Sequence, residues 1–358
     1  MNKMDPFDPK NASTSLTLTK GGNDTTVPTQ LVEMPLICRL IRAYPKTYRD
    51  SPLTHYDAYV FHGHTSIRVK WATSQCDSRL KQNALVAVHG LTQIPNKPDV
   101  FQISRLEVLD HPVPELNLFN TIPAYWVNDR ELIWQAARLM DALPGDYRHF
   151  FNAIFWDQKR FQRYCIGPSS MNHHHNYING NLIHSVEVAF NVFQACLPRP
   201  TASPALGILA ALLHDAGKAD EYIQLGNGKF KLSTQGKLLG HKNTVTQWIA
   251  QAKVLWNIPM RDDDYLALQH CLNSAPNAPA WTEIRRPVME EAFLLSGFDR
   301  MSGQQDLFQR CVSKAAGWSN YSESFKGRVF RVERFPAYDP GYGNQVGCDT
   351  QQLTYRVN

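Results

Sequence analysis

The stretch "LGILAALLHDAGK", residues 206 to 218, constrains the fold of this chain more than any other feature. A helix over 204–216 is apolar on nearly every side, so it must lie in the centre of a domain. It ends in the polar pair His214 and Asp215, and Gly217 stops it. Two polar side chains at the end of a buried helix are costly unless they are paired or bind a metal. The sequence therefore predicts a helical domain with a polar, metal-binding centre.

Further side chains of the metal-ligand type lie on other predicted helices. His184 falls nearly opposite the apolar stripe of its helix, on a polar face that must meet something else. Asp299 lies on an apolar stripe, where a carboxylate needs a cation or several donors. His241 shares a face with apolar side chains, so a buried core histidine is an equal interpretation, and His270 is uninformative by itself. In chain order these residues give the pattern H…HD…H…H…D.

The composition is that of a globular chain. Of its 358 residues, 43% are hydrophobic and 19% are charged, which suits two or three domains. The net charge of +5 permits contact with nucleic acid without requiring it. Seven scattered cysteines with no CxxC pair argue against a disulfide framework and against a zinc ribbon. Because we find neither a membrane-length apolar run nor the apolar core of a signal peptide, we expect a cytoplasmic protein without a membrane partner.

Two regions of different periodicity follow one another along the chain. Strand-like runs such as "AYVFHGHTSIRVKWAT" and "ALVAVHGLTQI" indicate a small β-barrel or meander over about 55 to 110. From about residue 128 the period becomes helical, and "GRVFRVERF" is typical of a late strand. The predicted fold class is α+β, mainly α. Helices are expected over 147–165, 181–198, 204–216, 241–256, 262–273 and 287–302. The expected division is a flexible tail at 1–30, a β domain at 31–112, a linker and helix at 113–150, a helical domain at 151–305 and a C-terminal extension at 306–358.

The motifs around these ligands resemble the HD superfamily of metal-dependent phosphohydrolases, in particular its 3'-to-5' exoribonucleases of the YhaM type. The family's "LLHDxGK" corresponds to "LLHDAGK" at 212–218, and its "LLGH" corresponds to 238–241. Its paired histidine corresponds to His174-His175, and its glycine turn corresponds to Asn179-Gly180. Its "LxxH" corresponds to "NLIH" ending at His184, and its "LxH" corresponds to Leu268–His270. Its "EAxxLxxxDxL" corresponds to "EAFLLSGFDRM" at 291–301. That family places an OB-fold before its HD domain. The resemblance, over roughly 55 to 305, thus implies a small OB-like barrel followed by an all-α HD helical bundle.

The sequence departs from the family pattern at two positions. Ala275 stands where the family's "SHHG" has a histidine, and Ser302 stands where a second aspartate is usual. These departures predict one firmly held metal and a second that is held weakly or not at all. The histidine triplet at 173–175 and "HSVEVA" at 184–189 are also similar to the HD domain of the TraI-type H-class relaxases. A nuclease, a relaxase-associated or non-catalytic nucleic-acid-binding protein of a mobile element, and a nucleotide phosphohydrolase therefore remain open.

The resemblance also implies a metal centre and a set of catalytic residues. A first divalent cation would be bound by His184, His214, Asp215 and Asp299, and Asp215 would bridge to a second cation beside His241 and His270. Mn²⁺ is expected first, with Fe²⁺, Zn²⁺ or Mg²⁺ as alternatives. The expected catalytic residues are Asp215, Lys218, His174 and His175, with His173 as a bystander. For Lys218, a solvated cation at a helix end is an equal interpretation.

The predicted activity is that of a metal-dependent phosphodiesterase that shortens single-stranded RNA or DNA from the 3' end. OB-folds hold single strands through aromatic and basic side chains. The expected nucleic-acid contacts are Arg68, Lys70, Trp71 and Arg79, with Phe61 and Phe101 as further stacking candidates. Aromatic side chains of a small barrel are more often part of its core, so both interpretations stand. Assembly into a homo-oligomer is also expected.

Overall fold

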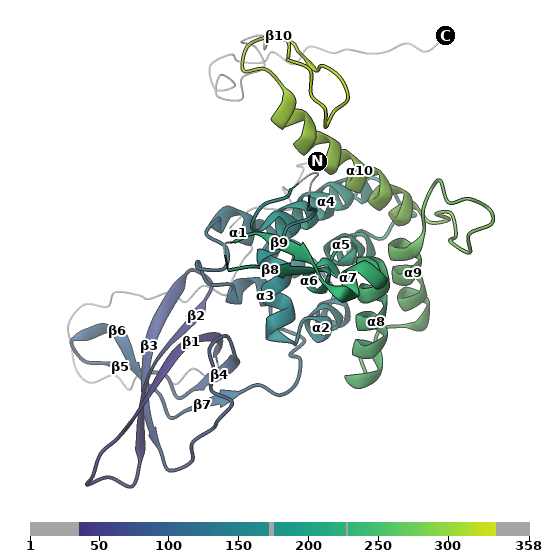
Figure 1. Cartoon of the computed structure of the whole chain (residues 1–358). Helices are drawn as coiled ribbons and strands as arrows, with labels where there is room; N and C mark the ends of the chain where they lie inside the picture. The colour runs from purple at the N-terminus through teal and green to yellow at the C-terminus, as the bar shows by residue number, and fades with distance from the viewer. Residues whose placement is uncertain (1–35, 172–174, 227, 334–358) are drawn as a thin grey trace, which may run out of the picture.

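The computed structural model describes residues 36–171, 175–226 and 228–333, and it places two regions one after the other (Figure 1). The expected tail at 1–30, the residues His173 and His174, and residues 334–358 lie outside this part of the chain. A seven-stranded sheet comes first and a group of helices follows it, which confirms the α+β fold class. Among the described helices, none is long and apolar enough to span a membrane.

The N-terminal region is a curled sheet that agrees with the expected OB-like barrel. β1, β2 and β3 form an antiparallel meander, and β4 pairs with β1. The stretch 97–108 brings the two ends of the sheet toward each other, because β6 runs parallel to β3 while β7 runs antiparallel to β4. The result is a partly open barrel. The strands are β1 (Leu36–Thr47), β2 (Thr54–His62), β3 (Thr65–Thr73), β4 (Leu85–His89), β5 (Thr92–Ile94), β6 (Lys97–Gln102) and β7 (Arg105–Val108).

Side chains that alternate along these strands form a separate apolar core inside the barrel. Leu40, Val60 and Val69 point inward and are fully buried. Trp71 also lies inside, stacked on Tyr56 with the two ring centroids 4.6 Å apart. The strand β1, which supplies Leu40, precedes the region where the sequence predicted strands. Its second half is exposed and contains a proline, so its pattern of alternation is weak.

The helical region is built around α5 (Pro204–Leu213), which contacts α2, α4, α9 and α10. Every residue from Leu206 to Leu213 is buried, as the all-round apolar sequence predicts. Residues of the expected linker, from Leu116 to Leu143, pack into this same core. The other helices are α1 (Arg130–Asp141), α2 (Gly145–Ile154), α3 (Gln158–Ile166), α4 (Gly180–Cys196), α6 (Lys218–Glu221), α7 (Thr234–Leu238), α8 (Gly240–Leu255), α9 (Asp262–Asn273) and α10 (Glu290–Cys311).

Several elements differ from the expected ranges. The helix expected over 147–165 is wrong as a single element, because Asp157 caps a new start by accepting hydrogen bonds from the backbone of Lys159 and Arg160. α10 continues to Cys311 rather than ending at 302. The hairpin of β8 (Tyr222–Gln224) and β9 (Phe230–Leu232) was not predicted, since such short strands carry little periodicity. Within the described residues, the strand expected over 327–335 is present only as β11 (Phe330–Arg331), which pairs with β10 (Gly317–Trp318).

Arg39 of β1 joins the barrel to the helical region and is fully buried. Its guanidinium donates hydrogen bonds to the carbonyl oxygens of Thr121 and Asn83, both at 2.9 Å, and to the side-chain oxygen of Gln158. It also lies 4.5 Å from the ring centroid of Trp126. Burial lowers the pKa of Arg39 to about 9, and these contacts offset the cost of the buried cation. Arg39 is thus one of the contacts between the two regions, beside the hydrogen bond of 2.6 Å from the backbone N–H of Gly63 to the carbonyl oxygen of Asn120.

Candidate metal centre

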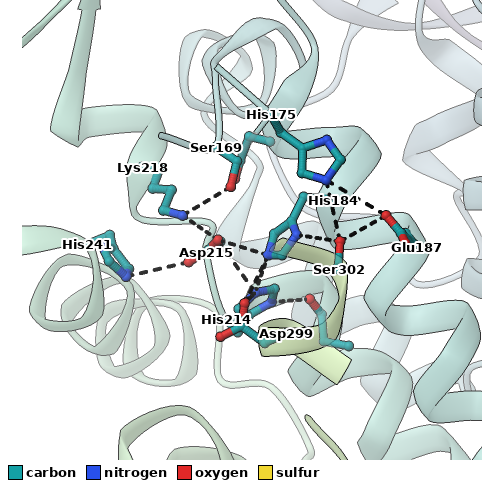
Figure 2. Close-up of polar contacts among 12 residues, drawn as sticks. Ser169, His175, His184, Glu187, His214, Asp215, Lys218, His241, Asp299 and Ser302 are labelled. Atoms are coloured by element: carbon teal, nitrogen blue, oxygen red, sulfur yellow. Dashed lines mark hydrogen bonds and ion pairs between the residues drawn. The ribbon is translucent and has the colours of Figure 1, made fainter. Parts of the chain in front are cut away.

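Four side chains from three segments meet at the end of α5 (Figure 2). His184 comes from α4, His214 and Asp215 follow α5, and Asp299 comes from α10. Their ligand atoms all lie within 4.8 Å of one another, which no other group of such residues achieves in the described part of the chain. The first three residues are buried, whereas the Asp299 side chain is 47% exposed. The group is thus accessible to solvent on the Asp299 side.

The spacing of these atoms fits a single bound cation. Nε2 of His184 lies 3.1 Å from Nε2 of His214 and 3.1 Å from Oδ1 of Asp299. The same nitrogen lies 3.3 Å from Oδ2 of Asp215. A metal with bonds of about 2.1 Å holds neighbouring ligand atoms about 3.0 to 3.4 Å apart in octahedral or tetrahedral geometry. Two imidazole nitrogens with two carboxylate oxygens suit Mn²⁺, Fe²⁺ or Zn²⁺.

Both imidazoles are oriented with Nε2 toward this shared centre. Nδ1 of His214 contacts the carbonyl oxygen of Ala211 at 2.7 Å, so it carries the proton. Nδ1 of His184 lies 3.0 Å from Oγ of Ser302, whose hydroxyl donates to Glu187 at 2.8 Å. Because the Ser302 proton is directed at Glu187, Ser302 accepts from His184. Each ring therefore presents an unprotonated Nε2 to a metal when it is neutral.

Replacing Ser302 by alanine is expected to weaken Mn²⁺ binding about tenfold to a hundredfold, because His184 loses the acceptor that fixes its tautomer and orientation. Isothermal titration of the metal-free protein with Mn²⁺ measures the change. Ser313→Ala, at a half-buried serine beyond α10, is the matched control and should bind Mn²⁺ as the wild type does. Equal affinities for the two variants would show that Ser302 does not position His184.

The ionisable groups at this centre depend strongly on one another. Burial opposes a charge on His184, but its hydrogen bonds to Asp215 and Asp299 outweigh that effect and raise the pKa of the imidazole to about 9. Burial also opposes the Asp215 carboxylate, yet Lys218 and His214 outweigh it and hold the pKa of Asp215 well below its usual range. Asp215 is therefore an anion in the folded protein. A divalent cation held by these residues would take the place of the proton on His184.

Lys218 lies inside the site and not at a solvated helix end. It is buried, and its ammonium donates to Oδ2 of Asp215 and to Oγ of Ser169 at 3.2 Å. The interpretation as a solvated cation is therefore wrong. The turn that carries Lys218 packs closely on α8, where a Cβ at Gly217 would lie 2.1 Å from the carbonyl oxygen of His241. Only glycine permits this approach of the ligand-bearing turn.

The two histidines expected at a second metal lie in different surroundings. Nε2 of His241 lies 3.4 Å from Oδ1 of Asp215, the carboxylate oxygen that Lys218 does not contact. Nδ1 of His241 is held by Glu221 at 2.8 Å. His270, in contrast, accepts a hydrogen bond from a backbone N–H group at 3.0 Å through its Nε2. The structure brings His241 beside the expected bridging carboxylate and leaves His270 engaged elsewhere.

His175 lies at the rim of the centre, as the sequence predicted for the histidine pair. Its side chain is buried, and its ring centroid is 5.5 Å from that of His184. Nδ1 contacts the hydroxyl of Tyr177 at 2.9 Å, and Nε2 lies 3.4 Å from Oγ of Ser302. The other expected catalytic histidine, His174, lies outside the described residues.

Sequence reasoning did not identify the polar residues that support the ligands, although it noted Ser302 as a departure from the family pattern. Glu187 follows His184 by three residues, and Ser302 follows Asp299 by three, so each supporting residue shares a helix face with a ligand. A search at this spacing from each ligand would have found both. Glu221, which holds His241, lies in a short helix that the sequence did not predict, so no comparable signal pointed to it.

The expected nucleic-acid contacts are spread over different parts of the barrel. Arg68 and Lys70 project from β3, and both form ion pairs with Asp57. Trp71 belongs to the core, which supports the alternative interpretation of this residue as a structural aromatic. Arg79 forms ion pairs with two neighbouring aspartates. The structure therefore does not gather the four residues into one surface.

Arg68 and Lys70 lie together with further basic and aromatic side chains in two neighbouring rows on the outer face of the meander. The register places Tyr59 between Arg42 and Arg68, and the guanidinium of Arg68 lies 5.8 Å from the Tyr59 ring centroid. The neighbouring row holds Tyr44, Asp57 and Lys70. Tyr44 is 40% exposed and Tyr59 38%, so both rings are accessible. We call Arg42, Tyr44, Tyr59, Arg68 and Lys70 the outer-face group.

Curated proteins named 3'-5' exoribonuclease YhaM match about half of this chain. The protein of Listeria welshimeri is 26% identical over 175 residues, which are 49% of this chain and 53% of the relative. The protein of Shouchella clausii is 25% identical over 185 residues, which are 52% of this chain and 55% of the relative. The chain thus spans about half the length of the curated relatives it matches. No family model and no solved structure matches it. By its motifs, its barrel followed by helices and these relatives, the chain is similar to the YhaM-type exoribonucleases.

Proposed function

We propose that this chain is a metal-dependent 3'-5' exonuclease that hydrolyses single-stranded RNA. The four-ligand group at the end of α5 carries the proposal, because it can hold a cation and is accessible on the Asp299 side. The buried ammonium of Lys218 adds a positive charge suited to a phosphate. The relatives are named as 3'-5' exoribonucleases, which supports RNA as the polymer and the 3' end as the starting point.

The chemistry of the donors fits a resident divalent cation. His184, His214, Asp215 and Asp299 would hold it, and Mn²⁺ is our first choice among the metals that suit such mixed ligands. When bound, the cation supplies Lewis-acid activation of water and neutralises charge on the phosphodiester. A second cation would have only Asp215 and His241 as close ligands, so we propose one tight site and one weak site.

The remaining polar residues would bind the substrate or transfer a proton. Lys218 would contact a non-bridging phosphate oxygen, with Ser169 holding its ammonium in place. His175 lies at the rim, and as an imidazolium it would donate a proton to the leaving 3' oxygen. Tyr177 would orient this ring through the contact with Nδ1.

End-labelled substrates test this function directly. Single-stranded RNA labelled at its 5' end should give, with Mn²⁺, a ladder that shortens from the 3' end, and EDTA should abolish it. The His214→Ala, Asp215→Ala double variant should give no ladder. Parallel reactions contain single-stranded DNA and free nucleotides. Cleavage of free nucleotides alone would indicate a nucleotide phosphohydrolase, and binding without turnover would indicate a non-catalytic nucleic-acid-binding protein.

Removing both outer-face rings, in a Tyr44→Ala, Tyr59→Ala variant, is expected to weaken binding of single-stranded RNA at least about tenfold. Each ring offers a stacking surface beside arginine side chains. Fluorescence anisotropy with a labelled oligonucleotide measures the affinity. The control is Tyr321→Ala, which removes a 56% exposed ring beyond α10. If all three proteins bound equally well, the outer-face group would not be the RNA-binding surface.

A further inference from the structure

A cavity of about 600 Å³ lies between the loop before α4 and the β8–β9 hairpin. Met171 and Tyr177 line it from the loop, and Lys229 and Phe230 line it from the hairpin. Its volume falls in the range of pockets that hold small molecules, about 300 to 1,000 Å³. None of its lining residues belongs to the four-ligand group or to the outer-face group, so it is a separate feature.

This cavity lies next to the metal centre. Two of its lining residues, Pro168 and Ser170, flank Ser169, whose hydroxyl accepts a hydrogen bond from Lys218. On the other side, the Tyr177 hydroxyl contacts His175, the histidine at the rim of the centre. A ligand in the cavity would therefore contact residues that are next to Ser169 in sequence or in direct contact with His175. Ser169 and His175 adjoin the groups that we assign to the scissile phosphate.

The lining combines the side-chain types that recognise a nucleotide unit. Tyr177 is 43% exposed and Phe230 is half-buried, so each presents part of a ring for stacking. The amide of Asn176 can exchange hydrogen bonds with a base edge. Lys229 brings a positive charge to the hairpin side of the cavity. Aromatic rings with an adjacent cation are the means by which proteins bind nucleotides without strong sequence preference.

We propose that this cavity binds the base of the 3'-terminal nucleotide and so places the last phosphodiester at the metal centre. The inference rests on the proposed function, since it assigns a subsite for the substrate of that reaction. Stacking against Tyr177 and Phe230 accepts any base, because every base has an aromatic face. Binding of the terminal base here limits each cleavage event to a single nucleotide at the end of the strand.

Binding of the released product tests the subsite. Calorimetry on the Mn²⁺-loaded full-length protein compares AMP with ribose 5-phosphate, which has the same phosphate but no base. We expect wild type to bind AMP at least about tenfold more tightly than ribose 5-phosphate, and Phe230→Ala to lose that difference. The control Phe325→Ala removes another partly exposed ring, beyond α10, and should retain it. Equal binding of both ligands by wild type, or an unchanged preference in Phe230→Ala, would overturn the subsite.

The same proteins separate this inference from the proposed function. If wild type shortens RNA but shows no preference for AMP, the exonuclease stands and the subsite is wrong. If wild type prefers AMP in a Phe230-dependent manner but leaves RNA intact, the cavity is a nucleotide site and the exonuclease is wrong. Tyr177 is not used as a test position, because its hydroxyl also contacts His175.

Discussion

Asp215→Asn is expected to reduce Mn²⁺-dependent hydrolysis of RNA by at least about a thousandfold. The change removes the anionic charge from the group in which His184, His214 and Asp299 also lie. It also removes the carboxylate partner of Lys218, a buried cation. Metal binding and substrate positioning are therefore lost together. For this reason the isosteric Asp215→Asn substitution has the largest expected effect on activity.

The measurement for this prediction is kcat/KM on labelled RNA, with circular dichroism to verify that the variant is folded. Asp262→Asn is the matched control, because the Asp262 side chain is 90% exposed on α9 and pairs only with Lys253 in the described residues. It should retain wild-type activity. If Asp215→Asn kept more than about a tenth of wild-type activity, Asp215 would not be a ligand or a charge partner in the reaction.

Arg39→Ala is expected to lower the free energy of unfolding by about 3 kcal/mol, the largest effect on stability that we predict. The substitution leaves the carbonyl oxygens of Asn83 and Thr121 without their buried donor. It also opens a cavity beside Trp126, where the guanidinium now packs. Both losses occur where the barrel meets the helical region, so the two regions should unfold in separate steps in the variant.

Urea unfolding followed by tryptophan fluorescence measures this change. The control is Arg105→Ala, since the Arg105 side chain is 65% exposed and pairs only with Glu107 among the described side chains. An exposed pair of this kind contributes at most about 1 kcal/mol. Equal unfolding curves for the two variants would show that Arg39 does not hold the barrel against the helices.

The group of His184, His214, Asp215 and Asp299 could be predicted from the sequence because these residues break the pattern of otherwise apolar helices. His214 and Asp215 end a helix that is buried on all sides, and Asp299 interrupts an apolar stripe. A histidine or aspartate that is buried between helices needs a hydrogen-bond partner or a cation, however the helices pack. The residue type therefore limits the possible roles of these side chains. The position of His270 could not be predicted in the same way, because its contact with the backbone of Val288 depends on the course of a loop.

The barrel was predicted in outline and not in detail. Alternation identifies strands, but it does not say which face of a curled sheet is inside. Trp71 and Arg68 lie in the same strand, yet the first is in the core and the second faces outward. The exposed ring of Tyr59 becomes a neighbour of Arg42 and Arg68 only through the register of three strands. The burial of Arg39 likewise depends on the packing of two regions.

The central claim is that His184, His214, Asp215 and Asp299 together hold a divalent cation. Counting bound Mn²⁺ by electron paramagnetic resonance tests it most directly, because free Mn²⁺ gives a sharp signal that is lost on binding. We expect one tightly bound Mn²⁺ per chain in the wild type and none in the His214→Ala, Asp215→Ala variant. A wild type without a tight site, or a variant that still binds Mn²⁺ tightly, would contradict it.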